Sequence, residues 1–455
     1  MSALASSLSA TTRLGTKSAK RLVQTPVRQA GRFRPFVEKE IPVKETMLRP
    51  KKRVRCYLWG GTLSGALGRD KFVRPLGVTI DRVSHHCSYP SKIGFSENHM
   101  MKDIACGYGF TIFAARHDER LNDFELFGTG INSDSQLGSQ KADNKADMRL
   151  LTEPVPIRFP THENGRRIHV RKVAAGRAHT IAVTDQGIAY GLGNNSLGQC
   201  GREIDPDEVY FGRDLVRRIR VPGKVAEVVC GLDHTLFLTE SGEVYACGWG
   251  ADGQTGLGHY GNTGVPQKVQ GDIEGVRIVE LATRGDCSLA VSSSGDVFGW
   301  GNNEYGQLLG EKGESQRHTP KHIRFNKRIK KVAAGGSSCL ASDEEGRVYC
   351  WGYGILGLGP AVGHSSSPKQ IPAALFGATE LSPNTRVVSL ASGLNDFAAI
   401  NDQGHLFTWG RNQNGCLGLG HEKNQMFPLK VNIAVRVAKV SIGVDHMAAI
   451  TQSYC

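Results

Sequence analysis

One short phrase occurs seven times along this chain of 455 residues. It consists of an aromatic or aliphatic residue, a glycine, a few polar residues, and then Gly-Gln-Leu-Gly or a variant of it. Its clearest copies read WGADGQTGLG, WGNNEYGQLLG and WGRNQNGCLG. Such a period constrains the fold before any local pattern does, because each copy must build the same small unit. The copies begin at Gly60, Gly130, Gly193, Gly250, Gly301, Gly352 and Gly410.

A second phrase alternates with the first. A small residue and a glycine are followed by two variable residues, a histidine or a substitute, and an alternating apolar run, as in AAGRAHTIAVT. Successive anchors of this phrase lie 69, 55, 53, 51, 58 and 50 residues apart, so one unit has about 51 residues plus insertions. The anchors are Gly107, Gly176, Gly231, Arg284, Gly335, Gly393 and Gly443.

Within each unit, short β-rich runs are separated by glycine turns and show no helical periodicity. This pattern predicts antiparallel strands. A strand pair cannot bury both of its faces alone, whereas radial stacking of such units buries them and leaves only short edges. The repeats therefore predict an all-β fold, with a single seven-bladed β-propeller over residues 53–455.

The two ends of the repeat region complement each other. The chain enters the first unit at its second half, before Gly60, and stops after the first half of another unit, near Thr451. We therefore expect the N- and C-terminal half-units to share one blade, with residues 57–59 paired to residues 447–450. All five tryptophans directly precede a glycine of the first phrase, and we expect them to pack as wedges between blades.

The interleaved phrases resemble those of the regulator of chromosome condensation repeat family, from about Arg53 to the C-terminus. Segments such as ACGYGFT and CGWGADGQTGLGHY look like the mitochondrial branch of that family. WD-repeat propellers are the nearest alternative, but their units are shorter, about 40–45 residues. The resemblance implies a propeller that acts by binding other macromolecules.

The formal net charge of +13 belongs almost entirely to the amino terminus. The first 55 residues hold fourteen Lys or Arg and three Glu, while the remainder carries only +2. This tail has no acidic residue before Glu38 and is rich in Ser and Thr, which is typical of a mitochondrial transit peptide. We expect a transit peptide at residues 1–40, cleaved between residues 28 and 45, and a linker at 41–52. The alternative is a basic arm that contacts RNA or DNA.

The rest of the composition points away from metal or membrane-spanning functions. Eleven cysteines are scattered without a Cys-x-x-Cys pair, which indicates free thiols in a reducing compartment. No apolar run approaches the roughly 18 residues of a membrane span. We expect no cofactor, metal site or catalytic constellation, and a mitochondrial matrix location in which peripheral contact with the inner membrane stays open.

The turns of the second phrase carry the candidate GTPase-binding residues. In the nuclear member of the family, as the resemblance implies, Asp and His at these turns contact a small GTPase and promote nucleotide release. For the histidines, the alternative is a polar side chain that bonds a turn at the blade face. The candidates are His179, Asp233, His234, Asp286, Asp396, Asp445 and His446.

Basic clusters precede the first strand of what the spacing indicates are three successive units. If the edges of those units align, the clusters form a stripe suited to the RNA backbone. The alternative is a charged edge that discourages strand pairing between molecules. The candidates are Arg166, Arg167, Arg171, Lys172, Arg217, Arg218, Arg220, Lys327, Arg328, Lys330 and Lys331.

Two functions of different classes follow from the resemblance. The first is guanine-nucleotide exchange, without bond chemistry, on a mitochondrial dynamin-like GTPase that promotes fusion. The second is a non-catalytic scaffold for RNA and assembly factors in biogenesis of the mitochondrial large ribosomal subunit. The two roles can coexist. The acidic turns favour the first function and the basic clusters favour the second.

Overall fold

The repeated phrases form four-stranded antiparallel sheets, seven of them within the described residues. The structure is a computed structural model that describes residues 54–69, 85–116, 124–160, 168–310 and 313–452. The chain divides into Met1–Arg49, outside these ranges, and Pro50–Cys455, to which the description below applies. The expected transit peptide at 1–40 and linker at 41–52 lie outside the described residues and stay predictions.

Each sheet is one blade, and the blades are numbered here in chain order. Blade 1 contains β3 (Met100–Cys106), β4 (Phe110–Arg116), β5 (Glu125–Ile131) and β6 (Leu150–Pro156). Blade 2 contains β7 (Val170–Ala175), β8 (His179–Thr184), β9 (Ala189–Gly193) and β10 (Arg217–Ile219). Blade 3 contains β11 (Val225–Cys230), β12 (His234–Thr239), β13 (Val244–Gly248) and β14 (Thr263–Lys268). Blade 4 contains β15 (Ile278–Thr283), β16 (Cys287–Ser292), β17 (Val297–Asn302) and β18 (Gln316–Ile323).

The remaining blades follow the same plan, and short helices lie only in their connections. Blade 5 contains β19 (Ile329–Ala334), β20 (Ser338–Asp343), β21 (Val348–Tyr353) and β22 (His364–Gln370). Blade 6 contains β23 (Val387–Ser392), β24 (Asp396–Asn401), β25 (Leu406–Gly410) and β26 (Gln425–Lys430). Blade 7 contains β27 (Arg436–Ile442), β28 (His446–Gln452), β1 (Val54–Gly61) and β2 (His86–Lys92). The helices are α1 (Phe95–Asn98), η2 (Ala373–Phe376) and η3 (Gln413–Gly415).

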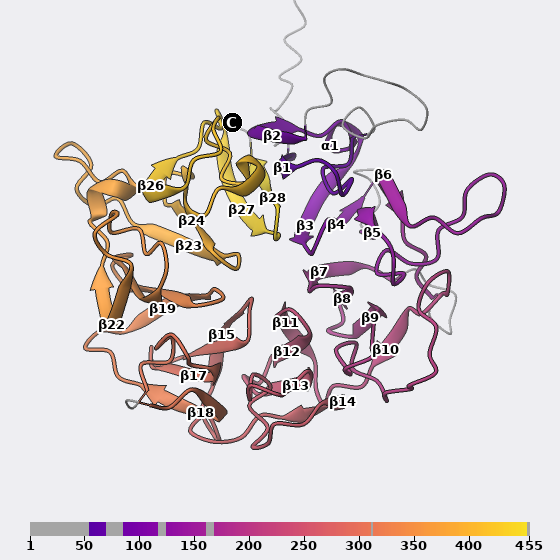
Figure 1. The fold of residues 1–455 in the computed structure, drawn as a ribbon, viewed down its shortest axis with the longest axis horizontal. Coiled ribbons are helices and arrows are strands. Elements are labelled where there is room, and N and C mark those ends of the chain that lie inside the picture. The colour runs from indigo at the N-terminus through magenta and orange to yellow at the C-terminus, as the bar shows by residue number, and fades with distance from the viewer. Residues whose placement is uncertain (1–53, 70–84, 117–123, 161–167, 311–312, 453–455) are drawn as a thin grey trace, which may run out of the picture. The chain divides into compact units, whose positions relative to one another are not determined.

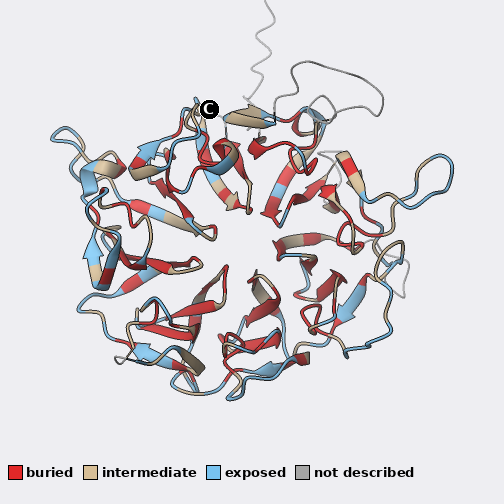
Figure 2. Ribbon diagram, viewed as in Figure 1, coloured by how far each residue is buried: buried red, intermediate tan, exposed pale blue. Residues whose placement is uncertain are grey.

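The first strands of the blades surround the centre of a ring (Figure 1). Each contacts the first strand of the next blade, and the last of these contacts, between β27 and β3, closes the circle. Apolar side chains fill the spaces between blades, as where Ile112 of blade 1 and Val173 of blade 2 share one cluster. Burial is therefore concentrated within the blades, and exposed residues collect on outer strands and loops (Figure 2). The predicted seven-bladed β-propeller is confirmed.

The two ends of the repeat region meet in blade 7, as expected. Strand β1 pairs with β28 in the register Tyr57↔Ala449, Leu58↔Ala448 and Trp59↔Met447. The sheet order β2-β1-β28-β27 combines strands from both ends of the chain. Pairing of these half-units joins segments nearly 400 residues apart in sequence, so blade 7 fastens the ring.

Four of the five tryptophans pack between blades, and three of these are tied to the preceding blade by a hydrogen bond. The indole N–H of Trp300 in blade 4 donates to the carbonyl oxygen of Gln254 in blade 3 at 2.9 Å. Trp351 of blade 5 makes the equivalent bond to Gln307 of blade 4 at 2.8 Å. Trp59, Trp300, Trp351 and Trp409 are fully buried.

The prediction that Trp249 is a wedge of the same kind is wrong. Trp249 is 36% exposed, and the buried position in blade 3 belongs to Cys247. Gly248, with φ +106°, pairs with His234 where other blades place the glycine after the tryptophan. A Cβ at Gly248 would lie 2.5 Å from the carbonyl oxygen of Asp233, so this position requires glycine. The repeat anchor is therefore Gly248, two residues before Gly250.

Candidate functional site

The turns between the first and second strands of the blades all lie at one face of the ring, because the strands of each blade alternate in direction. The loops between third and fourth strands return to the same face. We call this surface the turn face. Asp233, Asp286 and Asp445 lie in its turns, as the sequence predicted, whereas Asp396 begins β24.

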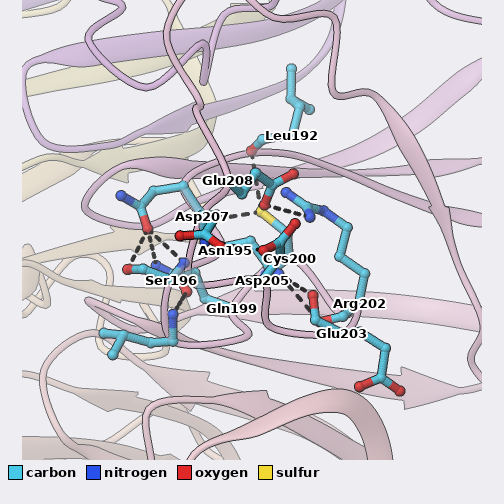
Figure 3. Close-up of polar contacts among 12 residues, drawn as sticks. Leu192, Asn195, Ser196, Gln199, Cys200, Arg202, Glu203, Asp205, Asp207 and Glu208 are labelled. Carbon is cyan, nitrogen blue, oxygen red and sulfur yellow. Dashed lines mark hydrogen bonds and ion pairs between the residues drawn. The ribbon is translucent and has the colours of Figure 1, made fainter.

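Four of the loops between third and fourth strands are each closed by an asparagine of their own, which is Asn132, Asn195, Asn303 or Asn412. In blade 2, the side-chain oxygen of Asn195 accepts from the backbone N–H of Cys200 at 3.0 Å (Figure 3). Asn303 accepts from Leu308 at 2.8 Å in the same way. An ion pair of 2.6 Å between Arg202 and Glu208 further orders the blade 2 loop. The polar residues of the first phrase therefore determine the shape of these loops. The long loop of blade 2 extends the turn face, and the sequence analysis did not identify it as a candidate.

The three candidate histidines are fully buried and connect neighbouring blades. Nε2 of His179 in blade 2 lies 3.1 Å from the hydroxyl of Thr235 in blade 3. That hydroxyl already donates to the carbonyl oxygen of Gln199, so the imidazole must donate through Nε2–H. His234 reaches Thr283 at 3.0 Å and His446 reaches Thr111 at 2.8 Å. In this structure each ring is hydrogen-bonded to a threonine of the neighbouring blade. This structural role is close to the alternative of a polar side chain that bonds a turn at the blade face.

Burial keeps two of these histidines neutral, and a carboxylate distinguishes the third. Burial lowers the pKa of His179 and of His234 to about 3. Nδ1 of His446 lies 2.9 Å from the carboxylate of Asp445. Burial alone would lower the pKa of His446, but Cys106 and Asp445 outweigh it and hold the pKa at about 10. Burial would likewise raise the pKa of Asp445, yet the bond to His446 leaves it below its usual value.

Asp233 and Asp286 lie in the turns of neighbouring blades and share an electrostatic environment. The carboxylate of Asp233 accepts two contacts from the guanidinium of Arg177 in blade 2, at 2.5 and 3.1 Å. Asp286 is half-buried and accepts from the side-chain amide of Gln254 at 3.2 Å. Burial, then the charges of Asp252 and Asp233, raise the pKa of Asp286 to about 6. Blades 3 and 4 thus hold a group of carboxylates near one another, while Asp445 lies apart in blade 7.

Arg284 crosses the centre of the ring at this face. It takes the anchor position that is glycine in the other six copies of the second phrase. Its guanidinium donates to the carbonyl oxygens of Ala175 in blade 2 and Cys106 in blade 1, at 3.2 and 3.1 Å. Burial raises the pKa of Asp396 to about 7, against the opposing charge of Arg284. The replacement of the repeat glycine by Arg284 is the sequence signal that distinguishes this residue. That signal alone does not reveal which residues Arg284 contacts.

The structure does not bring the basic clusters onto one edge. Arg217 and Arg218 are exposed on β10, the outer strand of blade 2, whereas Arg171 and Lys172 lie on its inner strand β7. The third cluster belongs to blade 5, so the three units are not successive. Lys327, Arg328, Lys330 and Lys331 form that third cluster, and Arg166 and Arg167 lie outside the described residues.

Two lysines of these clusters take part in ion pairs between inner strands. The first strand of every blade has a register shift near its start, where it pairs with the second strand. The residues that form these ion pairs directly follow the shift. Lys172 pairs with Glu227 of blade 3 at 2.8 Å, and Lys331 pairs with Glu280 of blade 4 at 2.8 Å. Lys439 pairs with Asp103 across the junction of blades 7 and 1. These lysines therefore link blades, while Arg217, Arg218 and Arg220 stay exposed.

No group of three or more His, Cys, Asp or Glu within the described ranges could hold a metal ion. In the same ranges, no helix is long and apolar enough to cross a membrane. The ten cysteines that the structure describes are free, and nine of them are buried.

Comparison with known families agrees with this architecture. The model of the RCC1-like domain matches residues 45–339, and RCC1 repeat models match residues 329–357 and 403–450. The chain belongs to the RCC1-like domain family. The resemblance inferred from the two phrases is therefore confirmed.

Relatives of the RCC1-like domain family align over most of this chain. The RCC1-like G exchanging factor-like protein of Mus musculus is 41% identical and aligns over 92% of each chain. The crystal structure of human WBSCR16 is similar with a TM-score of 0.81 and 40% identity, covering 88% of this chain and 100% of that one. The RCC1 domain-containing protein RUG3, mitochondrial, of Arabidopsis thaliana is 30% identical over 86% of this chain and 87% of its own length. The chain is thus a propeller protein that is similar to relatives named as G exchanging factor-like proteins.

Proposed function

We propose that this chain is a guanine-nucleotide exchange factor for a mitochondrial dynamin-like GTPase that promotes fusion. The observation that carries the proposal is the placement of Asp233 and Asp286 in neighbouring turns of one rigid face. Membership of the RCC1-like domain family and the name of the mouse relative support it. Exchange requires no bond chemistry, since the factor need only bind the nucleotide-free GTPase more tightly than the nucleotide-bound form.

The rigidity of the turn face suits this task. Asp233 is held by Arg177 and Asp286 by Gln254, so both carboxylates have fixed positions before a partner arrives. A pre-organised surface loses little conformational entropy on binding. Its carboxylates can therefore compete for a cationic part of the GTPase that otherwise contacts the nucleotide.

A mitochondrial location is the second part of the proposal. Residues 1–40 are basic, rich in Ser and Thr, and free of acidic residues before Glu38, which is the composition of a transit peptide. The name of the Arabidopsis relative includes a mitochondrial location and supports the same compartment. A matrix location is proposed, and peripheral contact with the inner membrane is compatible with it.

The test is release of a fluorescent GDP analogue from a purified mitochondrial dynamin-like GTPase, with and without the full chain. We expect catalytic amounts of the wild type to accelerate GDP release. The double variant Asp233→Asn with Asp286→Asn should accelerate release at least about tenfold less than the wild type does. Asp296→Asn is the matched control, because Asp296 lies in a turn between second and third strands, on the opposite face. No acceleration by the wild type would reject the proposal.

One observation favours a second function, a scaffold for RNA and assembly factors in mitochondrial large ribosomal subunit biogenesis. Arg217, Arg218 and Arg220 are exposed at the outer edge of blade 2, and none forms an ion pair with a carboxylate of the described residues. Replacing all three with Gln should weaken binding to ribosomal RNA and reduce its salt dependence by about one unit of slope for each lost phosphate contact. Unchanged affinity and slope would reject this second function at that edge.

A further inference from the structure

Exposed aromatic side chains gather on the turn face of blades 3, 4 and 5. Trp249 is 36% exposed, Tyr305 is 45% exposed and Tyr353 is 53% exposed. Each lies in, or at the start of, a loop between third and fourth strands. Exposed apolar groups that cluster on a surface mark an interaction site more often than isolated ones do. We call Trp249, Tyr305 and Tyr353 the aromatic strip.

The repeat geometry places the three aromatic residues on three successive blades. Tyr305 of blade 4 stacks on Tyr353 of blade 5, with ring centroids 5.6 Å apart and planes inclined by 24°. Trp249 of blade 3 occupies the position of Tyr353, since each directly follows a glycine of positive φ, Gly248 or Gly352. The intervening blade places Asn302 at this position, after Gly301.

Carboxylates lie within the strip. The side chain of Asp252, at the blade 3 position equivalent to Tyr305, is hydrogen-bonded to Asn302. The backbone N–H of Glu304 donates to the side-chain oxygen of the same Asn302 at 3.1 Å, so both carboxylates lie beside Asn302. Burial and then the charge of Glu304 raise the pKa of Asp252. Glu304 also lines a hollow of about 570 Å³ at the edge of blade 4. The backbone N–H of Trp249 donates to the carbonyl oxygen of Asp233 at 2.8 Å, which places the strip beside the candidate turn acids.

This combination of groups selects among partners. Aromatic faces with adjacent carboxylates suit a guanidinium, which stacks on a ring and pairs with a carboxylate through its planar fork. An ammonium lacks the planar fork, and a phosphate backbone would be repelled by the carboxylates. A bare metal ion would make no use of the rings.

We propose that the aromatic strip, with Asp252 and Glu304, binds an arginine-bearing segment of a partner protein. A guanidinium lies against Trp249 or Tyr305 and forms an ion pair with Asp252 or Glu304. The inference deepens the proposed function by naming the chemistry of the partner surface. The inference rests on the proposed function in one respect, which is that the partner is a GTPase.

The experiment uses the full chain and a fluorescein-labelled peptide of alternating glycine and arginine, with matched lysine and citrulline peptides. We expect saturable anisotropy changes with the arginine peptide, at least about tenfold weaker binding of the lysine peptide, and no binding of the citrulline peptide. An unlabelled arginine peptide should also protect Trp249 from acrylamide quenching, because the other four tryptophans are already buried.

Variants locate the site. Trp249→Ala, and Asp252→Asn with Glu304→Gln, should each weaken binding of the arginine peptide at least about tenfold while the thermal midpoint stays unchanged. Tyr108→Ala is the control, since Tyr108 is an exposed aromatic residue of the same face in blade 1. The proposal is overturned if the arginine peptide does not bind at millimolar concentration, if citrulline binds equally, or if both variants bind like the wild type.

The outcome is separable from that of nucleotide exchange. Peptide binding at the strip without accelerated GDP release would support the strip and reject the exchange function. Accelerated GDP release by a protein that binds no arginine peptide would support exchange and reject the strip.

Discussion

The guanidinium of Arg284 in blade 4 donates a 3.1 Å hydrogen bond to the carbonyl oxygen of Cys106 in blade 1, across the centre of the ring. A second bond, to Ala175, ties blade 2 to the same side chain. One residue therefore couples three blades that are not all neighbours in the ring. This coupling ties the turn of blade 4, which carries Asp286, to blades 1 and 2.

Replacing Arg284 with Met should destabilise the propeller. The substitution removes both hydrogen bonds and the cation nearest Asp396, and hydrogen bonds of charged groups contribute about 1.5–3 kcal/mol each. We expect a loss of that order in the free energy of unfolding, measured by urea denaturation. Lys321→Met, on outer strand β18, is the control. An unchanged unfolding midpoint for the Arg284 variant would show that the bridge contributes no stability.

Trp300→Ala should cost about 3–5 kcal/mol, because it empties a fully buried position between blades 3 and 4. Trp249→Ala should change the thermal midpoint little, because the side chain is exposed. Differential scanning calorimetry of both variants measures the contrast. Equal midpoints for wild type and Trp300→Ala would contradict the packing described for this residue.

That contrast also shows what the sequence could and could not reveal. The repeats predicted the strands, the number of blades and the pairing of β1 with β28, because these follow from local patterns repeated in order. The Trp249 prediction failed because Gly248 and Gly250 flank the tryptophan, and only backbone geometry identifies Gly248 as the anchor.

The same limit applies to the candidate sites. The placement of Asp233 and Asp286 at one face followed from the repeat. The contacts of Arg284 with blades 1 and 2, and of Lys172 with Glu227, join residues more than 50 positions apart. Such contacts depend on how complete blades pack, and no spacing within one unit encodes them.

His234 should make the folded protein less stable as pH decreases. Its pKa is about 3 in the folded protein, against an ordinary histidine value of 6.5, so the unfolded chain takes up the proton first. This contribution is complete above pH 6.5 and is lost as pH falls toward 3. His234→Gln, which keeps a side-chain donor, should show a shallower decline in unfolding free energy. Asp396 acts in the opposite direction in both proteins and cancels in the difference.

The decline is measured by denaturant unfolding at several pH values between 4 and 7. His364→Gln, at an exposed histidine of blade 5, is the control and should leave the decline as in the wild type. Identical slopes for wild type and His234→Gln would mean that His234 is not held neutral between the blades.

Residues 1–40, fused to a fluorescent reporter, should carry it into mitochondria. The reason is the absence of acidic residues before Glu38 together with seven Lys or Arg up to Arg34. Replacing those seven with Gln is the matched control and should leave the reporter in the cytosol. A cytosolic or nuclear reporter with the unmodified segment would contradict the proposed location.

Nucleotide exchange through the turn face is tested by the affinity of the full chain for nucleotide-free and GDP-bound forms of the GTPase, measured by surface plasmon resonance. An exchange factor acting through the turn face must bind the nucleotide-free form at least about a hundredfold more tightly. Asp233→Asn with Asp286→Asn should reduce that preference, and Asp296→Asn should not. Equal affinity of the wild type for both forms, or a preference that survives the double substitution, would contradict the account.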